Sequence, residues 1–268
     1  MWQVSSVGGM SVQGVLMTLR ILSYNILWGG EDRLPLIARV IQLQQPDVVA
    51  LLEANSRPKA EALSQQLGMS LIFGNANSAF HVAWLSRLPI LQTENYRLPV
   101  FAKTLLKIEI PWESSSLALF ATHLQSGRDQ KREDHRVVEM QAILDILQPL
   151  GNQPHVLVGD MNALHLTDHT NVAVNPHIEP GEKEEHPQEP PFPRQSIPLL
   201  LKAGYVDCYR MLHPTTPGYT YKLPTPGLRL DYIFAPPPLA QRLQACDIVT
   251  AGEAVIASDH FPIWAEFG

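Results

Sequence analysis

Cysteine is scarce in this sequence, and basic residues are outnumbered by acidic ones. The 268 residues include two cysteines, Cys208 and Cys246. This is too few for a disulfide framework, and their spacing matches no zinc motif, so we expect two free thiols. Lysine and arginine total 20 against 26 aspartates and glutamates, a formal net charge of -6. This balance argues against a broad basic face that coats nucleic acid by neutralising phosphates.

Long apolar runs are also missing, so the sequence predicts no membrane span. Residues 1–18 have neither the basic start nor the cleavage site of a signal peptide, and we interpret them as a flexible leader. The composition, 45% hydrophobic and 17% charged, supports a substantial core. We expect a cytoplasmic monomer whose residues 19–268 form a single domain, interrupted by a Pro-, Glu- and His-rich loop at about 171–195.

Residues 155–163 carry the most informative local pattern. Residues 156–158 are an apolar run typical of a buried strand, which Gly159 is expected to end. Asp160 and Asn162 follow, and residues two apart at a strand end project to the same side. A carboxylate beside a carboxamide suits a site that handles an anionic oxygen. The alternative is an Asx-turn, in which both side chains only satisfy loop backbone.

Other predicted strands also end on polar residues. Residues 19–24 lead to Asn25, residues 47–52 to Glu53, and residues 117–121 to His123. Between the first two, Asp32 is a possible cap for a helix that Pro46 stops. Polar residues at successive strand ends are typical of a site built at a sheet edge, although each could singly be a cap or a surface residue.

The C-terminal part adds two more acidic positions and a histidine. Asp231 interrupts the apolar run 229–234, which is costly unless the carboxylate has a partner. Asp259 and His260 stand next to each other before the last predicted strand. These residues are candidates for the same site.

A long helix is predicted over residues 128–148, with an apolar face that is typical of packing. Its basic residues alternate with acids, so we expect a solvated charged surface there, formed by Arg128, Lys131, Arg132 and Arg136. The sequence shows no alternation of aromatic and basic residues of the kind that lines a groove for a nucleic-acid strand.

Taken in order, these segments resemble the motifs of the endonuclease/exonuclease/phosphatase superfamily, the metal-dependent phosphohydrolases of the DNase I type. The resemblance runs from about residue 19 to the C-terminus. Its motifs are Ser23-Tyr24-Asn25-Ile26, Leu51-Leu52-Glu53-Ala54, Ala121-Thr122-His123-Leu124, Gly159-Asp160-Met161-Asn162, Arg229-Leu230-Asp231-Tyr232-Ile233-Phe234 and Ser258-Asp259-His260.

The resemblance implies an α/β fold, a four-layer sandwich of two packed mixed β-sheets flanked by helices. It implies hydrolysis of a phosphate ester by in-line attack of water, assisted by Mg²⁺ or Mn²⁺. Its expected metal shell contains Glu53 as the principal ligand, with Asn25 and Asp259. The expected catalytic residues are His123, Asp160, Asn162, Asp231 and His260.

The resemblance also implies a role for each catalytic residue. Asp160 would orient or deprotonate the water, and Asn162 would donate to a phosphoryl oxygen. His260 would bind the scissile phosphate while paired with Asp231, and His123 would bind phosphate or assist the leaving oxygen. These shared residues do not determine which phosphate ester is the substrate.

We expect an endo- or exonuclease-type phosphodiesterase whose partner is a phosphoester, with nucleic acid the leading candidate. A phosphatase or phosphodiesterase acting on a small or lipid phosphoester is the alternative. A binding protein that has lost the chemistry is disfavoured, because the expected site residues are all present.

Overall fold

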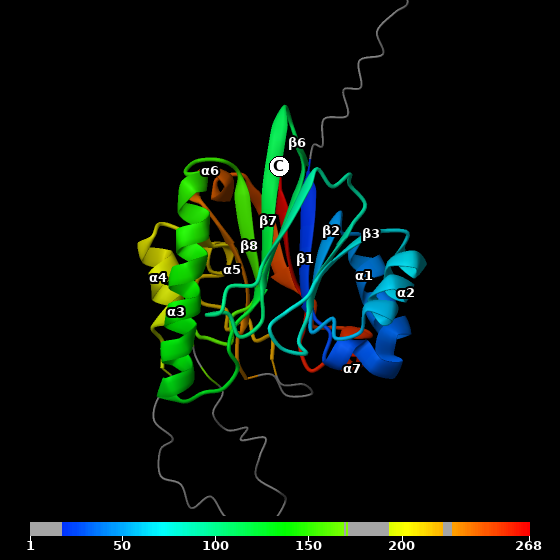
Figure 1. Cartoon of the computed structure of the whole chain (residues 1–268), viewed down its shortest axis with the longest axis horizontal. Coiled ribbons are helices and arrows are strands. Elements are labelled where there is room, and N and C mark those ends of the chain that lie inside the picture. The colour runs from blue at the N-terminus through cyan, green and yellow to red at the C-terminus, as the bar shows by residue number, and fades with distance from the viewer. Residues whose placement is uncertain (1–17, 169, 171–192, 222–226) are drawn as a thin grey trace, which may run out of the picture.

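Two six-stranded mixed sheets pack face to face, with helices on both outer sides (Figure 1). The structure, a computed structural model, describes residues 18–168, 170, 193–221 and 227–268. A large apolar cluster that includes Leu51, Trp84, Leu119 and Ile233 fills the space between the sheets. The predicted four-layer α/β sandwich is confirmed.

The first sheet has its earliest and latest strands side by side. Its order is β11 (Leu243–Ile248), β12 (Ile263–Phe267), β1 (Leu19–Asn25), β2 (Val48–Leu52), β4 (Val82–Ser86) and β3 (Ser70–Gly74). β1 runs parallel to β2 and antiparallel to β12. The 3-10 helix η1 (Trp28–Arg33) follows β1, and Figure 1 shows α1 (Leu34–Gln44), α2 (Arg57–Leu67) and α7 (Ala254–Ala257) on the outer side of this sheet.

The second sheet contains the other parallel pair, β7 and β8. Its order is β5 (Gln92–Tyr96), β6 (Leu105–Trp112), β7 (Ser115–His123), β8 (His155–Asp160), β10 (Asp231–Ala235) and β9 (Val206–Asp207). On its outer side lie α3 (Gln130–Leu147) and α4 (Ser196–Lys202) (Figure 1). The remaining short helices are η2 (Gln148–Leu150), α5 (Cys208–Leu212) and α6 (Pro237–Ala240).

Local chemistry explains several of these bounds. The strands β2, β4 and β8 are buried at every residue, which accounts for their unbroken apolar runs. The helix α2 ends at Gly68, whose left-handed conformation favours glycine. Both cysteines are free, as predicted, and both are buried.

Two local predictions are wrong. Asp32 does not cap α1, because it lies within η1 and α1 begins at Leu34 without a side-chain cap. Gly159 does not end its strand, because β8 continues to Asp160. A Cβ atom on Gly159 would lie 1.9 Å from the carbonyl oxygen of Thr122 on β7. The glycine therefore allows two strands to approach closely, and it is not there to make a turn.

The expected solvated surface on α3 is wrong for Arg136, which is fully buried. Its Nε donates to Glu133 at 2.7 Å, and its Nη1 donates to the carbonyl oxygens of Gln125 and Gly127, each at 2.8 Å. The Glu133 carboxylate also accepts from the backbone N–H of Ser196 at the start of α4. The two charged side chains therefore bind backbone groups before α3 and at the start of α4 that would otherwise lack hydrogen-bond partners.

Among the described residues, no helix is both long and apolar enough to cross a bilayer. The predicted leader, except Thr18, and residues 171–192 of the predicted loop lie outside the described part of the chain.

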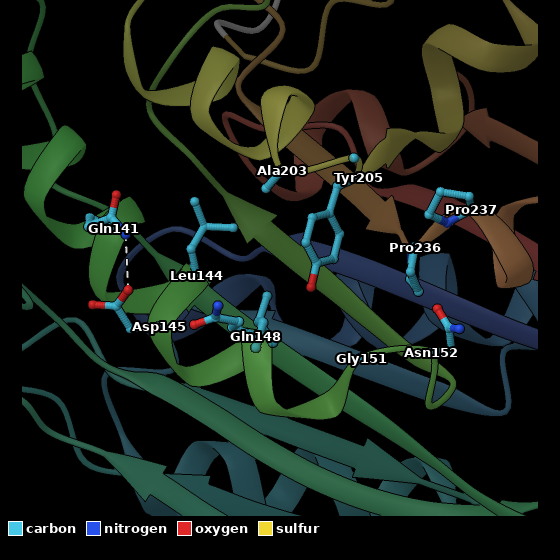
Figure 2. A pocket seen from close by; sticks show the side chains of 12 residues that line it. Gln141, Leu144, Asp145, Gln148, Gly151, Asn152, Ala203, Tyr205, Pro236 and Pro237 are labelled. Atoms are coloured by element: carbon cyan, nitrogen blue, oxygen red, sulfur yellow. Dashed lines mark hydrogen bonds between the residues drawn. The ribbon is translucent and has the colours of Figure 1, made fainter.

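A hollow of about 510 Å³ lies near the start of β8, lined by residues of α3, the segment after α4 and the start of α6 (Figure 2). Tyr205 is on its wall, and the Tyr205 hydroxyl lies 2.6 Å from Nε2 of His155. Nδ1 of His155 lies 2.7 Å from the carbonyl oxygen of Gln153, which can only accept. Nδ1 therefore carries the hydrogen, and Nε2 accepts from Tyr205.

This histidine predicts a pH dependence of stability. Burial lowers the pKa of His155 below its ordinary value of 6.5, so the unfolded chain takes up a proton before the folded chain does. The free energy of unfolding should fall as the pH drops through about 6.5. We expect the fall to be shallower in His155→Gln, measured by urea unfolding between about pH 7.5 and pH 5.5. The Tyr205→Phe control keeps the imidazole, and parallel curves for His155→Gln and the wild type would contradict the prediction.

Candidate active site

The predicted site residues meet where strands of both sheets end, at the lower edge of the sandwich in Figure 1. Asn25, His123 and Asp160 are the last residues of β1, β7 and β8, and Glu53 follows β2 directly. Asp231 opens β10 opposite Asp160, while Asp259 and His260 precede β12. The two strands of a parallel pair have their carboxyl ends at the same edge of the sheet. Residues that are distant in sequence therefore come together there.

Asn25 connects two carboxylates across the gap between the sheets. Its Nδ2 lies 3.1 Å from Oδ2 of Asp160 and 3.3 Å from Oε1 of Glu53. Its Oδ1 accepts from the backbone N–H of Leu27 at 3.1 Å. The side chain of Asn25 is therefore fixed in orientation, with its amide facing the acidic groups.

Glu53 is held by an unusual loop. Its φ is 57°, its carboxylate accepts from the N–H of Trp28 at 2.9 Å, and its carbonyl accepts from the N–H of Gly29 at 2.7 Å. Residues 27–31 all have positive φ. Left-handed backbone costs roughly 1–2 kcal/mol for each residue that is not glycine. Strain of this kind is kept where surrounding contacts require it, commonly at functional sites.

Asp160 lies at the centre of the polar cluster. Its Oδ2 is 3.5 Å from Nε2 of His123 and 3.8 Å from Nε2 of His260, while Oδ1 accepts from the N–H of Asn162 at 2.9 Å. Burial raises the pKa of Asp160 to about 7, against the opposing effect of the charge on His260. A carboxylate with a pKa near neutrality is suited to general-base chemistry.

The Asx-turn considered for Asp160 and Asn162 exists, with Asp160 in the cluster and the Asn162 side chain bonded to the neighbouring Leu124 carbonyl. Strand alternation does not explain their placement, because β8 ends at Asp160 and Asn162 has a φ of 48°. The Asn162 amide donates to the carbonyl oxygen of Leu124 at 3.1 Å, and Nζ of the buried Lys103 donates to the same oxygen at 2.7 Å. Sequence reasoning did not single out Lys103, since nothing near it marks it as part of a site.

His260 and Asp231 form a buried pair, with 2.7 Å between Nδ1 and Oδ2. Burial alone would lower the pKa of His260, but the charge of Asp231 and this hydrogen bond outweigh it and raise the pKa to about 10. His260 is therefore a cation at neutral pH. By contrast, burial and the nearby Lys103 lower the pKa of His123, so that imidazole is neutral.

Several contacts that sequence reasoning missed hold this pair in place. Ser258 Oγ donates to the carbonyl oxygen of Asn25 at 2.7 Å, and Thr220 Oγ1 accepts from the N–H of Asp231 at 3.1 Å. Two residues before Asp231, the buried Arg229 binds Asp207 at 2.7 Å and Asp168 at 3.1 Å. The hydrogen bond from Asp231 to Thr220 and the ion pairs of Arg229 thus hold the start of β10 in place.

The oxygen donors fit a hard divalent cation. Glu53 and Asp160 present carboxylates on either side of Asn25, and Mg²⁺ prefers oxygen ligands. Oδ1 of Asp231 is buried and has no hydrogen-bond partner among the described residues, so the cluster contains an oxygen acceptor that is left unsatisfied. The ligand atoms of Asp160, Asp231 and His260 lie within 4.8 Å of one another, but a protonated His260 cannot ligate a metal.

Asp259 is the one predicted metal residue without a direct contact to the carboxylates. It is half-buried, and its Oδ1 lies 3.5 Å from Oγ of Ser258, the residue that binds the Asn25 carbonyl. The structure therefore brings Asn25, Glu53 and Asp160 together directly and places Asp259 beside them through Ser258.

Aromatic rings lie beside both histidines of the cluster. The Trp28 and Phe80 ring centroids are 5.0 Å apart, and the Phe80 and His123 centroids are 6.2 Å apart. The Tyr221 and His260 ring centroids are 4.8 Å apart. These rings come from segments that are distant in sequence, so no local sequence pattern predicts their contacts.

Solved structures with the same architecture come from several sources. They include a 3′ phosphatase, NExo, from Neisseria bound to product DNA hairpin (TM-score 0.73, 20% identity, 93% of this chain and 99% of that chain). An AP endonuclease from Archaeoglobus fulgidus matches at a TM-score of 0.70 and 22% identity, over 93% of this chain and 99% of its own. D. rerio TDP2, complexed with single-strand DNA product, matches at a TM-score of 0.68 and 19% identity, over 94% of this chain and 99% of its own.

A comparison with curated protein sequences finds no match. The model of one protein family, described as the Endonuclease/Exonuclease/phosphatase family, matches residues 22–260. That span contains every site residue predicted above. It begins within β1 and ends in the segment before β12. The chain belongs to the endonuclease/exonuclease/phosphatase family.

Proposed function

We propose that this protein is a divalent-metal-dependent phosphodiester hydrolase of the nuclease type. The observation that carries the proposal is the arrangement around Asp160. A buried carboxylate with a pKa near 7 faces a cationic His260, and Asn25 links it to a second carboxylate, Glu53. Acid, base and anion-binding groups within one cluster suit hydrolysis of a charged ester.

In the proposed reaction, water attacks phosphorus in line with the ester bond that breaks. Asp160 orients the water and takes its proton, the bond from phosphorus to the leaving oxygen breaks, and that oxygen takes a proton from solvent water. His260 binds a non-bridging phosphoryl oxygen, and Asp231 keeps His260 charged and oriented. Asn162, fixed by Leu124, donates to another phosphoryl oxygen, and the neutral His123 assists at the leaving oxygen.

The metal shell in this proposal contains Glu53, with Asp259 nearby and with Asn25 beside it as the donor that orients the Glu53 carboxylate. Mg²⁺ or Mn²⁺ bound there would neutralise charge on the phosphate and act as a Lewis acid. The loop of residues 27–31 fixes the Glu53 carboxylate in advance, because the N–H of Trp28 binds one of its oxygens.

Nucleic acid is the proposed substrate class. Two of the structural relatives hold DNA products, one a hairpin and one a single strand. The net charge of -6 is consistent with contacts confined to the site and its margin. One relative is described as a 3′ phosphatase, which makes a terminal phosphomonoester the second candidate substrate.

Hydrolysis of a substrate panel tests the proposal. The panel contains bis-p-nitrophenyl phosphate, p-nitrophenyl phosphate, single- and double-stranded DNA, an abasic duplex, a 3′-phosphorylated strand, RNA and sphingomyelin, each with Mg²⁺, Mn²⁺ or EDTA. We expect cleavage of nucleic acid that EDTA abolishes. Preferred hydrolysis of a monoester or of sphingomyelin would contradict the nuclease assignment. No hydrolysis of any substrate in the panel would overturn the proposal.

The metal assignment predicts a specific defect in Glu53→Gln. The amide keeps the size of the side chain but removes the charge, so half-maximal activity should need at least about tenfold more Mn²⁺. The control is Glu61→Gln on α2, an exposed glutamate paired with Arg57 and outside the cluster. Equal Mn²⁺ dependence in Glu53→Gln and the wild type would remove Glu53 from the metal shell.

A further inference from the structure

The aromatic pair at the edge of the site has features of a ligand surface. Trp28 is 53% exposed, although tryptophan is usually well buried, and Phe80 is partly exposed beside it. The two rings are tilted by 54° with centroids 5.0 Å apart, so they make a joint apolar surface. A large exposed aromatic side chain beside a polar cluster is typical of a binding surface.

The pair lies next to the candidate active site. The backbone N–H of Trp28 donates to Glu53 at 2.9 Å, and the Phe80 and His123 ring centroids are 6.2 Å apart. Whatever stacks on Trp28 and Phe80 therefore lies close to the groups proposed to bind metal and assist the leaving oxygen. Residues 27–31 all have positive φ, a strained backbone that contacts such as the hydrogen bond from Trp28 to Glu53 help to hold.

We propose that Trp28 and Phe80 form a stacking platform for one unpaired nucleobase next to the scissile phosphate, on the side of Glu53 and His123. The inference rests on the proposed function and specifies its substrate as a nucleic acid with an unstacked base at this position. An aromatic face binds any base through its π surface, so the platform selects for the presence of a base over its identity. A base within a duplex is covered by its neighbours and could not reach it.

Binding without turnover tests the platform separately from the chemistry. Fluorescence anisotropy in EDTA would measure the affinity of a labelled oligothymidine and of the same backbone with tetrahydrofuran abasic residues. We expect the wild type to bind the base-containing strand about tenfold more tightly than the abasic strand. The preference should largely disappear in Trp28→Leu, which keeps apolar bulk, and largely persist in Trp28→Phe, which keeps a ring. Leu43→Ala, at an exposed position on α1, is the control outside the site.

Hydrolysis of the same two strands with Mn²⁺ separates the two proposals. An equal loss of affinity for both strands in Trp28→Leu would overturn the platform, as would binding by the wild type that ignores the bases or fails to occur. Cleavage of DNA together with any of these results would leave the proposed function standing. Base-dependent binding with no cleavage under any metal would instead keep the platform and refute the proposed function.

Discussion

His260→Ala is expected to lower kcat about a hundred- to a thousand-fold, the usual cost of removing one preorganised group that stabilises developing charge. His260 is a cation because Asp231 lies 2.7 Å from its Nδ1, and Nε2 faces Asp160 across 3.8 Å. Alanine removes the positive charge and leaves Asp231 buried without its partner. Steady-state kinetics on the best substrate of the panel measures the loss.

Metal affinity separates this effect from a general collapse of the site. Mn²⁺ binding, followed by electron paramagnetic resonance, should be nearly unchanged in His260→Ala because the proposed principal ligand is Glu53. His135→Ala, at an exposed histidine on α3 that contacts Val100, is the matched control. Full activity in His260→Ala would refute the assignment of His260 and with it the role of Asp231.

The second large effect is expected from Gly159→Ala. The new methyl group would lie 1.9 Å from the carbonyl oxygen of Thr122, an atom of the β7 backbone that cannot rotate away. The strands must separate where Asp160 and His123 meet, and the φ of 149° is also unfavourable for alanine. We expect a loss of about 3 kcal/mol in the free energy of unfolding, together with loss of activity.

Gly68→Ala provides the comparison for this substitution. Gly68 also has a positive φ, 63°, but nothing lies within 4 Å of its added Cβ. Because Gly68 is in the left-handed helical region, the cost should be limited to backbone strain of about 1 kcal/mol, with activity preserved. Urea unfolding and the substrate assay measure both variants. Similar losses in the free energy of unfolding for the two variants would show that β7 and β8 can move apart. The contact at Thr122 would then not require glycine.

The sequence predicted the fold because its strongest signals are local and redundant. The apolar runs of β2 and β8 and the amphipathic α2 with Gly68 at its end each identify their element without tertiary information. By contrast, β5 was missed because its residues are polar and mostly exposed, as suits an edge strand. Short elements such as β9 and α6 carry too few residues for a periodicity to appear.

The candidate site was predicted as a set of residues, but its internal contacts were not. Polar residues at strand ends are visible in the sequence, whereas the hydrogen bond from Asn25 to Asp160 joins residues from two sheets. Arg136 illustrates the same limit, since its sequence neighbours are charged and its burial depends on Glu133 and distant carbonyl groups. The pairing of Trp28 with Phe80 depends on loop conformation, which sequence periodicity does not encode.

The adjacency of β1 and β12 also governs when the protein can begin to act. During synthesis β1 emerges first among the strands, but one of its two edges stays open until residue 267 has left the ribosome. At translation rates of roughly 5–20 residues per second, that wait lasts about 10 to 50 seconds. His260 is made in the same late stretch, so a nascent chain that carries Asn25, Glu53 and Asp160 still lacks the cation proposed to bind phosphate. A chain built in this order cannot complete the candidate site before the segment that carries His260 and strand β12 have been made.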